Sequence, residues 1–139
     1  MKIGLFGGSF NPITKKDINL AKEAIDHLNL DKFIFIPFYK RNDRKNFKPG
    51  NDKHRMKMIN LAISNEEKME LSDFEIKRKG VSYSIDTVKF FSKHPNELFF
   101  IIGGDKLTNF DKFKNVEQLS KLSNLSIFEH LNHLKKIFL

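Results

Sequence analysis

The sequence has no cysteine and no tryptophan, and only seven glycines and four prolines among its 139 residues. The lack of cysteine excludes disulfide bonds and thiolate metal sites. No apolar run approaches the roughly 20 residues that cross a membrane as a helix, and the apolar run after Met1 is too short for a signal peptide. We therefore expect a cytoplasmic protein without a membrane span.

Hydrophobic residues are plentiful by comparison, at 40% of the chain. This share is enough to build a core, although 30% of the residues are charged, and it is not the composition of a disordered chain. The length fits one domain with a short appendage. We expect the domain to span residues 1–129 and a short helical tail to span residues 130–139.

The charge balance is strongly positive, with a formal net charge of +8 at pH 7. Such a balance favours anionic partners such as nucleotides, nucleic acids or acidic protein surfaces, although a lysine-rich codon bias produces it equally well. The densest basic stretch, residues 40–57, contains one aromatic residue, Phe47, and so lacks the stacking platforms of single-strand binders. We interpret this stretch as a solvated loop and nucleic-acid binding as the weaker alternative.

Uniformly apolar runs alternate with helical periodicity along the chain. The apolar runs predict buried parallel strands, and apolar side chains at spacings of three and four predict helices. Strands are expected at residues 3–6, 33–36, 98–102 and 125–128, helices at residues 17–28, 54–65, 84–92 and 116–122, and extended chain at residues 69–76. This order predicts an α/β domain with a doubly wound parallel sheet.

Two of the expected strands end in a pair of glycines, Gly7-Gly8 and Gly103-Gly104. Doubly wound sheets bind ligands at the carboxyl ends of their strands. Glycine lets the backbone come close to a ligand, and the N–H groups at the start of a following helix suit a phosphate. The first pair fits neither a Walker loop nor a dinucleotide fingerprint. The structural alternative is an ordinary tight turn between a strand and a helix.

Four segments carry a more specific pattern. They are Gly-Leu-Phe-Gly-Gly-Ser-Phe-Asn-Pro-Ile at residues 4–13, His54-Arg55-x-x-Met58, Gly-Val-Ser-Tyr-Ser-Ile-Asp-Thr at residues 80–87, and Phe-Ile-Ile-Gly-Gly-Asp at residues 100–105. Any one of them could arise by chance, but their shared order is specific. Together they resemble the bacterial nicotinate mononucleotide adenylyltransferases.

The resemblance implies a Rossmann-like nucleotidyltransferase fold and a step of NAD biosynthesis. In that reaction the phosphate of nicotinate mononucleotide attacks the α-phosphorus of ATP and pyrophosphate leaves, with help from Mg²⁺. Positioning and charge stabilisation are then the protein's main tasks. The cofactor-binding positions implied by the family are Gly7, Gly8, Ser9, Phe10, Gly103 and Asp105. The implied substrate-binding positions are Ser82, Tyr83, Thr87 and Phe113, the last in place of a family tryptophan.

The family's catalytic His-x-Gly-His motif is replaced here by Thr14-Lys15-Lys16-Asp17. Thr14 can still form hydrogen bonds, but Asp17 puts a carboxylate where the family has its second histidine. Two like charges 4 Å apart repel by about 4 kcal/mol at an effective dielectric constant of 20. Lys15 or Lys16 could supply a compensating charge. The structural alternative for Asp17 is the N-cap of the helix that follows, and Asp105 has the same alternative.

Two further family elements are missing. Residues 38–43 do not match a Pro-Pro-His-Lys-like segment, and the closing Ile-Ser-Ser-Thr-x-Ile-Arg motif, with its phosphate-binding arginine, does not occur in the 139 residues. Residues 130–139 stand in its place. We interpret His130 and His133 as part of a solvated tail rather than a metal site, and we expect no metal-binding residues.

These losses favour a catalytically impaired homologue, a pseudoenzyme that acts as a binding or assembly subunit of a larger complex. It would keep a site for an adenine nucleotide and bind protein partners or a second copy of itself, with Phe128, Ile137, Phe138 and Leu139 on a docking surface. The first alternative is an active adenylyltransferase in which Lys15, Lys16 and Thr14 replace the motif, with ATP and Mg²⁺ as cofactors. The second alternative is a basic nucleic-acid-binding protein.

Overall fold

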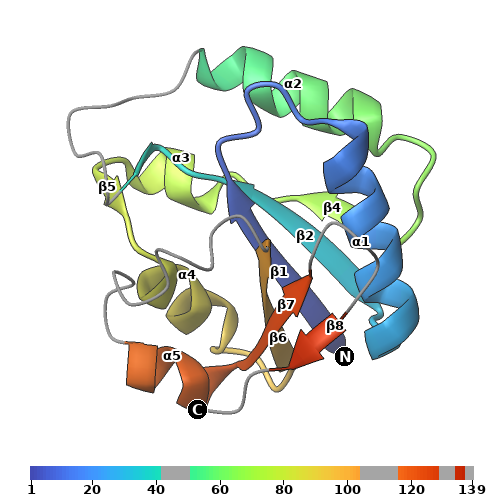
Figure 1. Ribbon diagram of the computed structural model, residues 1–139. Helices are drawn as coiled ribbons and strands as arrows, with labels where there is room; N and C mark the ends of the chain where they lie inside the picture. The colour runs from blue at the N-terminus through green and yellow to red at the C-terminus, as the bar shows by residue number, and fades with distance from the viewer. Residues whose placement is uncertain (42–50, 104–115, 129–133, 137–139) are drawn as a thin grey trace.

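The uniformly apolar runs form the inner strands of one twisted sheet (Figure 1). The computed structural model describes residues 1–41, 51–103, 116–128 and 134–136. The main sheet contains β1 (Lys2–Gly8), β2 (Lys32–Pro37), β4 (Met69–Leu71), β6 (Glu97–Gly103), β7 (Asn124–Phe128) and β8 (Leu134–Lys136). They stand in the order β4-β2-β1-β6-β7-β8, and each neighbouring pair is parallel except β7 with β8.

The chain changes its direction of growth between β1 and β6. It passes from β1 outward to β2 and β4, returns to the centre at β6, and continues outward to β7 on the other side. β1 pairs with β2 in the register Gly4↔Phe33, and with β6 in the register Phe6↔Ile101. This arrangement confirms the predicted doubly wound, Rossmann-like sheet. It makes the boundary between β1 and β6 the topological switch point, where such sheets bind their ligands.

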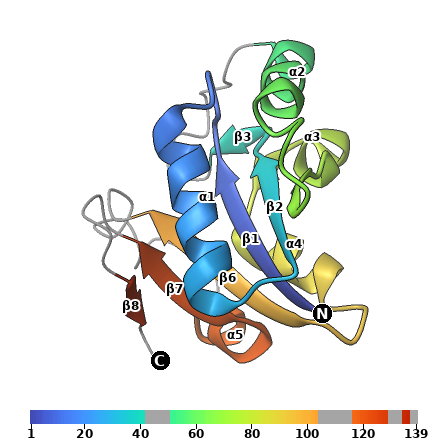
Figure 2. The same cartoon turned by 90° about the vertical axis from the view of Figure 1, so that its right-hand side faces the viewer.

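Helices cover both faces of the sheet, and α1 crosses the near face in Figure 2 while α5 lies behind it. The larger helices are α1 (Lys15–Leu28), α2 (Asp52–Ala62), α4 (Ser84–Phe91) and α5 (Val116–Leu122). Phe33 and Phe35 of β2 pack in the core that contains α1 and α2 residues, whereas Ile34 and Ile36 pack in the core that contains α4 and α5 residues. Because both faces are buried, these strands are continuously apolar.

Aromatic rings fill the core beneath α1. Phe6, Phe10, Phe33 and Phe35 are each no more than 5% exposed. Their ring centroids lie between 5.0 and 6.1 Å apart in five pairs, at tilted or edge-to-face angles. Each buried phenylalanine stabilises the fold by roughly 1.5–3 kcal/mol through the apolar area it removes from water. This cluster therefore anchors β1 and β2 directly under the start of the glycine-rich loop.

A short helix, α3 (Phe74–Arg78), corrects the expectation of extended chain at residues 69–76. The extended part ends at Leu71 with β4. The hydroxyl oxygen of Ser72 then accepts a hydrogen bond from the N–H of Phe74, at 3.3 Å. Such a local bond favours a turn over a strand, and it starts α3. Beyond α3, β5 (Val81–Ser82) pairs in parallel with β3 (Lys40–Arg41) as a second, two-stranded sheet.

We expected the basic stretch at residues 40–57 to be a solvated loop, but part of it is a helix. From Asp52 onward it belongs to α2, and Arg55 within it is fully buried. A buried guanidinium requires hydrogen-bond partners, and Arg55 has three, described below. Residues 42–50 lie outside the described part of the chain.

The expected helical tail is also wrong where the structure describes it. Leu134–Lys136 form β8, which pairs antiparallel with β7 through Ile127↔Lys135. A helix this short is marginal by itself, whereas the edge of a sheet offers unpaired N–H and C=O groups to an extended segment. His130, His133 and Phe138 lie outside the described residues. Within the described part of the chain, no helix is both long and apolar enough to span a membrane.

Replacing Phe35 by alanine should destabilise the protein by about 3–5 kcal/mol, because it opens a cavity in a close-packed aromatic cluster. Phe90 is a matched control, since its ring is 40% exposed and stacks mainly on Phe74 at 4.2 Å. Phe90→Ala should cost less than about 1.5 kcal/mol. Urea unfolding followed by circular dichroism measures both values. Equal losses for the two variants would contradict the placement of this core.

Candidate functional site

The glycines that end β1 and β6 lie together at the switch point. Phe6 pairs with Ile101, and each strand continues for two more residues, to Gly8 and Gly103. The two turns that the sequence singled out therefore leave neighbouring strands at the same edge of the sheet. Gly104 lies outside the described residues.

Phe10 uses its side chain for packing and leaves only its backbone for a ligand. Its ring is 5% exposed and meets Phe6 and Phe35 edge-on, at centroid distances of 5.6 and 5.5 Å. A Cβ added at Gly8 would lie 3.0 Å from the Cζ atom of this ring, a tight contact that a shift of the ring would have to relieve, so glycine leaves room for the ring to fold back under the loop. Phe10 was expected to bind the cofactor, and the buried ring restricts that role to the main chain.

The loop itself has an uncommon backbone. Phe10 has a φ of 46°, in the left-handed region that non-glycine residues seldom adopt. The peptide bond between Asn11 and Pro12 is cis. Ser9, between Gly8 and Phe10, is half-buried. The chain thus turns sharply from β1 toward α1 within six residues.

The first turn of α1 differs from the expected one. Thr14, not Asp17, is the N-cap, and the helix begins at Lys15. Asp17 occupies the third helical position and reaches back, so that its Oδ2 atom accepts hydrogen bonds from the Thr14 N–H at 2.9 Å and from the Thr14 hydroxyl at 3.1 Å. The Thr14 side chain in turn accepts from the backbone of Asp17, and this reciprocal arrangement is a capping box. The prediction that Asp17 caps the helix is right in function and wrong in position.

The first turn of α1 carries one negative charge that is hydrogen-bonded and two positive charges that are exposed. The Asp17 carboxylate is half-buried and bonded to Thr14, whereas Lys15 and Lys16 are exposed. Among the described residues neither lysine has an ion-pair partner. Cations in the first turn oppose the helix dipole by roughly 0.3–1 kcal/mol each. The two lysines therefore gain nothing from the helix and are available to an anion at the strand edge.

Arg55 lies beside this loop, although it is not among the site residues expected from the sequence. Its Nη1 atom donates to the Ser9 carbonyl at 2.8 Å, and its Nη2 atom donates to the Phe38 carbonyl at 2.9 Å and to Asp52 Oδ1 at 2.8 Å. Counting charges along the sequence cannot reveal burial. The signal that could have found it is its place in the His54-Arg55-x-x-Met58 match.

Three of the four expected substrate-binding residues lie in the described part of the chain. Thr87 is buried, and its hydroxyl donates to the buried Glu75 carboxylate at 2.5 Å, which links α4 to α3. Tyr83 is half-buried and packs against the core beneath α4. Ser82 ends β5, in the small sheet. Asp105 and Phe113 lie outside the described residues, so their roles stay predictions. Thr87 is therefore a structural link between the two helices, and its substrate contact stays a prediction.

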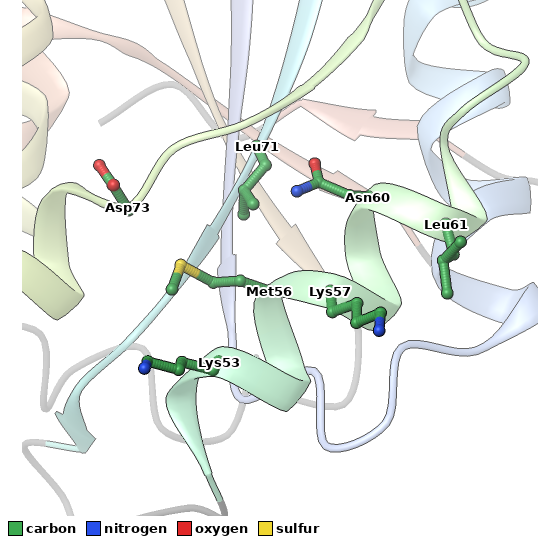
Figure 3. A pocket seen from close by; sticks show the side chains of 7 residues that line it. All are labelled: Lys53, Met56, Lys57, Asn60, Leu61, Leu71 and Asp73. Atoms are coloured by element: carbon green, nitrogen blue, oxygen red, sulfur yellow. The ribbon is translucent and has the colours of Figure 1, made fainter.

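A hollow of about 590 Å³ between α2 and the end of β4 does not coincide with the glycine turns. It is lined by Lys53, Met56, Lys57, Asn60, Leu61, Leu71 and Asp73. In Figure 3, Lys57 and Leu61 point away from Lys53 and Met56, so the lining side chains do not converge on one point. Among the described residues there is also no group of three or more side chains that could hold a metal ion. The candidate site therefore remains at the carboxyl ends of β1 and β6, where the glycine turns lie.

Known proteins share both the sequence pattern and the fold. The profile of the family described as cytidylyltransferase-like matches residues 5–136. A relative from Clostridium tetani, named probable nicotinate-nucleotide adenylyltransferase, is 40% identical over 130 residues, which are 91% of this chain and 64% of the relative. A relative of the same name from Aquifex aeolicus is 33% identical over 135 residues, which are 96% of this chain and 80% of the relative.

A solved structure gives the same picture. The nicotinic acid mononucleotide adenylyltransferase of Plasmodium falciparum, complexed with NaAD, superimposes with a TM-score of 0.78 at 25% identity. The match covers 92% of this chain and 64% of that one. These similarities confirm the resemblance found in the four segments. The chain spans 64% of the length of both the Plasmodium protein and the Clostridium tetani relative.

Replacing Asp17 by alanine should destabilise the protein by roughly 0.5–2 kcal/mol, because it removes the capping box at the start of α1. Asp26 is the matched control, an exposed aspartate near the end of the same helix. An acidic side chain there opposes the helix dipole, so Asp26→Ala should leave stability unchanged or raise it slightly. Thermal and urea unfolding measure the stability of both variants. An Asp17→Ala variant as stable as the wild type would refute the capping role.

Proposed function

Since the chain belongs to the cytidylyltransferase-like family, we propose that it transfers the adenylyl group of ATP to nicotinate mononucleotide, the reaction for which its relatives are named. One observation carries the proposal. Lys15 and Lys16 stand exposed in the first turn of α1, while the carboxylate of Asp17 is bonded back to Thr14. The rewritten motif thus presents positive charge between the two positions at which the family has its histidines.

The ATP phosphates would lie between the start of α1 and the carboxyl ends of β1 and β6. Gly7 and Gly8 allow a phosphate to approach the backbone closely. The N–H groups that open the 14-residue helix α1 favour an anion. Lys15 and Lys16 act as mobile point charges that can follow the phosphates. Gly103 closes the site from the neighbouring strand.

Mg²⁺ fits this site as part of the substrate rather than as a resident ion. The described residues contain no group of three or more metal-binding side chains. Mg²⁺ commonly keeps several waters and binds through substrate phosphates. It would therefore arrive as MgATP, and the protein's own groups would only orient that complex.

The transfer itself needs little covalent chemistry from the protein. A phosphate oxygen of the mononucleotide attacks the α-phosphorus of ATP, a new P–O bond forms, and the bond from the α-phosphorus to the bridging oxygen breaks. The electron pair leaves with pyrophosphate, whose growing negative charge lies beside Lys15 and Lys16. Charge stabilisation of this kind is a major part of catalysis in phosphoryl transfer.

A second candidate function is a nucleotide-binding or assembly subunit without turnover, and Asp17 is the observation that favours it. Its carboxylate stands where the family has a histidine, and a like charge 4 Å from a phosphate costs about 4 kcal/mol at an effective dielectric constant of 20. The hydrogen bonds from Thr14 reduce this repulsion without removing the negative charge. Such a subunit would bind ATP and release no pyrophosphate.

A variant without Lys15 and Lys16 helps to distinguish the catalytic function from the subunit without turnover. Pyrophosphate release is followed with ATP, Mg²⁺ and nicotinate mononucleotide, for the wild type and the variant Lys15→Ala/Lys16→Ala. We expect turnover in the wild type and a loss of about 100- to 1,000-fold in kcat in the variant, the usual effect of removing a charge-stabilising donor. Lys22→Ala is the control, because Lys22 lies on the same helix and pairs with Glu66 at 3.4 Å. It should keep wild-type activity.

Two outcomes would overturn the catalytic proposal. One is a wild type that binds ATP in calorimetry and releases no pyrophosphate, which supports the subunit without turnover. In that case Asp17→His with Lys16→Gly should create turnover if the rewritten motif is the main defect. The other is a double-lysine variant as active as the wild type, which would remove the assigned role of Lys15 and Lys16.

A further inference from the structure

Arg55 joins three separate segments at the edge of the candidate site. It belongs to α2 and is fully buried. One guanidinium nitrogen binds the Ser9 carbonyl in the loop after β1, and the other binds the Phe38 carbonyl after β2 and the carboxylate of Asp52. The N–H of Phe38 also donates to the Gly8 carbonyl at 3.0 Å. The glycine loop is thus fixed both directly by the β2 end and through Arg55.

The bond to Ser9 determines the direction of the next backbone donor. The Ser9–Phe10 peptide is trans, so its carbonyl and its N–H point in opposite directions. Since Arg55 holds the carbonyl toward α2, the Phe10 N–H points away from α2. Among the described residues this N–H has no hydrogen-bond partner. An oriented, unpaired backbone N–H beside a helix start is a donor suited to an anion.

We propose that Arg55 is a positioning residue that presets the loop after β1, so that the Phe10 N–H stays directed at a nucleotide phosphate. This role rests on the proposed adenylyl transfer. Arg55 touches no substrate and acts only through the Ser9 carbonyl. The left-handed backbone of Phe10, with φ at 46°, is a conformation that needs such external support.

Lysine cannot reproduce this arrangement. The planar guanidinium reaches Ser9 with one nitrogen and Phe38 and Asp52 with the other. A lysine ammonium is a single point on a flexible stem, and it cannot hold the same acceptors in one fixed geometry. Arg55→Lys therefore keeps the charge and removes the fixed direction, which makes it the informative substitution.

The test compares Arg55→Lys with Ile59→Ala. Ile59 lies on α2 one turn later and is fully buried, in the same core that holds the Phe10 ring, but it is not a partner of the Ser9 carbonyl. Both variants destabilise α2, so all measurements are made at a temperature at which circular dichroism shows them folded. ATP binding is measured by calorimetry, kcat and KM by pyrophosphate release, and the Ser9 ¹³C carbonyl and Phe10 amide resonances by NMR without nucleotide.

We expect Arg55→Lys to weaken ATP binding by about tenfold, the effect of misdirecting one hydrogen bond to a charged group, with KM for ATP raised in step. Its Ser9 and Phe10 resonances should shift. Ile59→Ala should bind ATP within about twofold of the wild type, because it leaves the bond between Arg55 and the Ser9 carbonyl in place. Equal ATP affinity for Arg55→Lys and the wild type, or an equal loss in Ile59→Ala, would overturn the positioning role.

A second variant covers the case in which Arg55→Lys does not fold. Asp52→Ala leaves Arg55 in place but removes its carboxylate partner, so it should weaken ATP binding and shift the same two resonances. Unchanged affinity and resonances in Asp52→Ala would then overturn the proposal. If the wild type binds no ATP, the proposed function fails. The role of Arg55 is then tested by the Ser9 and Phe10 resonances measured without nucleotide. If these resonances do not shift in the variants, Arg55 does not position the loop.

Discussion

The parallel pairing of β1 with β6 is the constraint on which the rest of the site depends. Its register brings Gly8 and Gly103 to the same edge of the sheet, although they are far apart in the sequence. It also places α1 over one face and α4 over the other, so the strand ends between them stay open to a ligand. Two side chains then hold the loop after β1 in place. The folded-back ring of Phe10 supports the loop from the core, and Arg55 fixes it from the side of β2.

Charge at the start of α1 shows how a catalytic motif can change while its scaffold persists. A helix start attracts anions, and a carboxylate there is stabilised by the helix itself. Asp17 satisfies that tendency through its bonds to Thr14. Lys15 and Lys16 remain exposed on the same turn and oppose the dipole. In this short segment the negative charge of Asp17 stabilises the helix start. The positive charges of Lys15 and Lys16 stabilise nothing in the described part of the chain.

The strand-helix order was predictable from the sequence because the inner strands are buried on both faces, and their apolar runs cannot be mistaken for solvent-facing chain. The helix at Phe74–Arg78 was not predictable, since five residues contain too little periodicity, and a local bond from the Phe74 N–H to the Ser72 hydroxyl oxygen decides its start. At the site, residue identity pointed to the glycine turns. It could not distinguish Thr14 from Asp17 as the cap, because both residue types cap helices. Nor could it reveal the buried bonds of Arg55, which depend on segments distant in the sequence.

Adenylyl transfer by a protein with this lysine-containing motif is tested most directly by following the α-phosphate of ATP. The wild-type protein is incubated with α-labelled ATP, Mg²⁺ and nicotinate mononucleotide, and the products are separated by chromatography. We expect the label to enter a dinucleotide only when the mononucleotide is present, with one pyrophosphate released for each dinucleotide formed. Label that stays in ATP, in a protein shown by calorimetry to bind ATP, would contradict it.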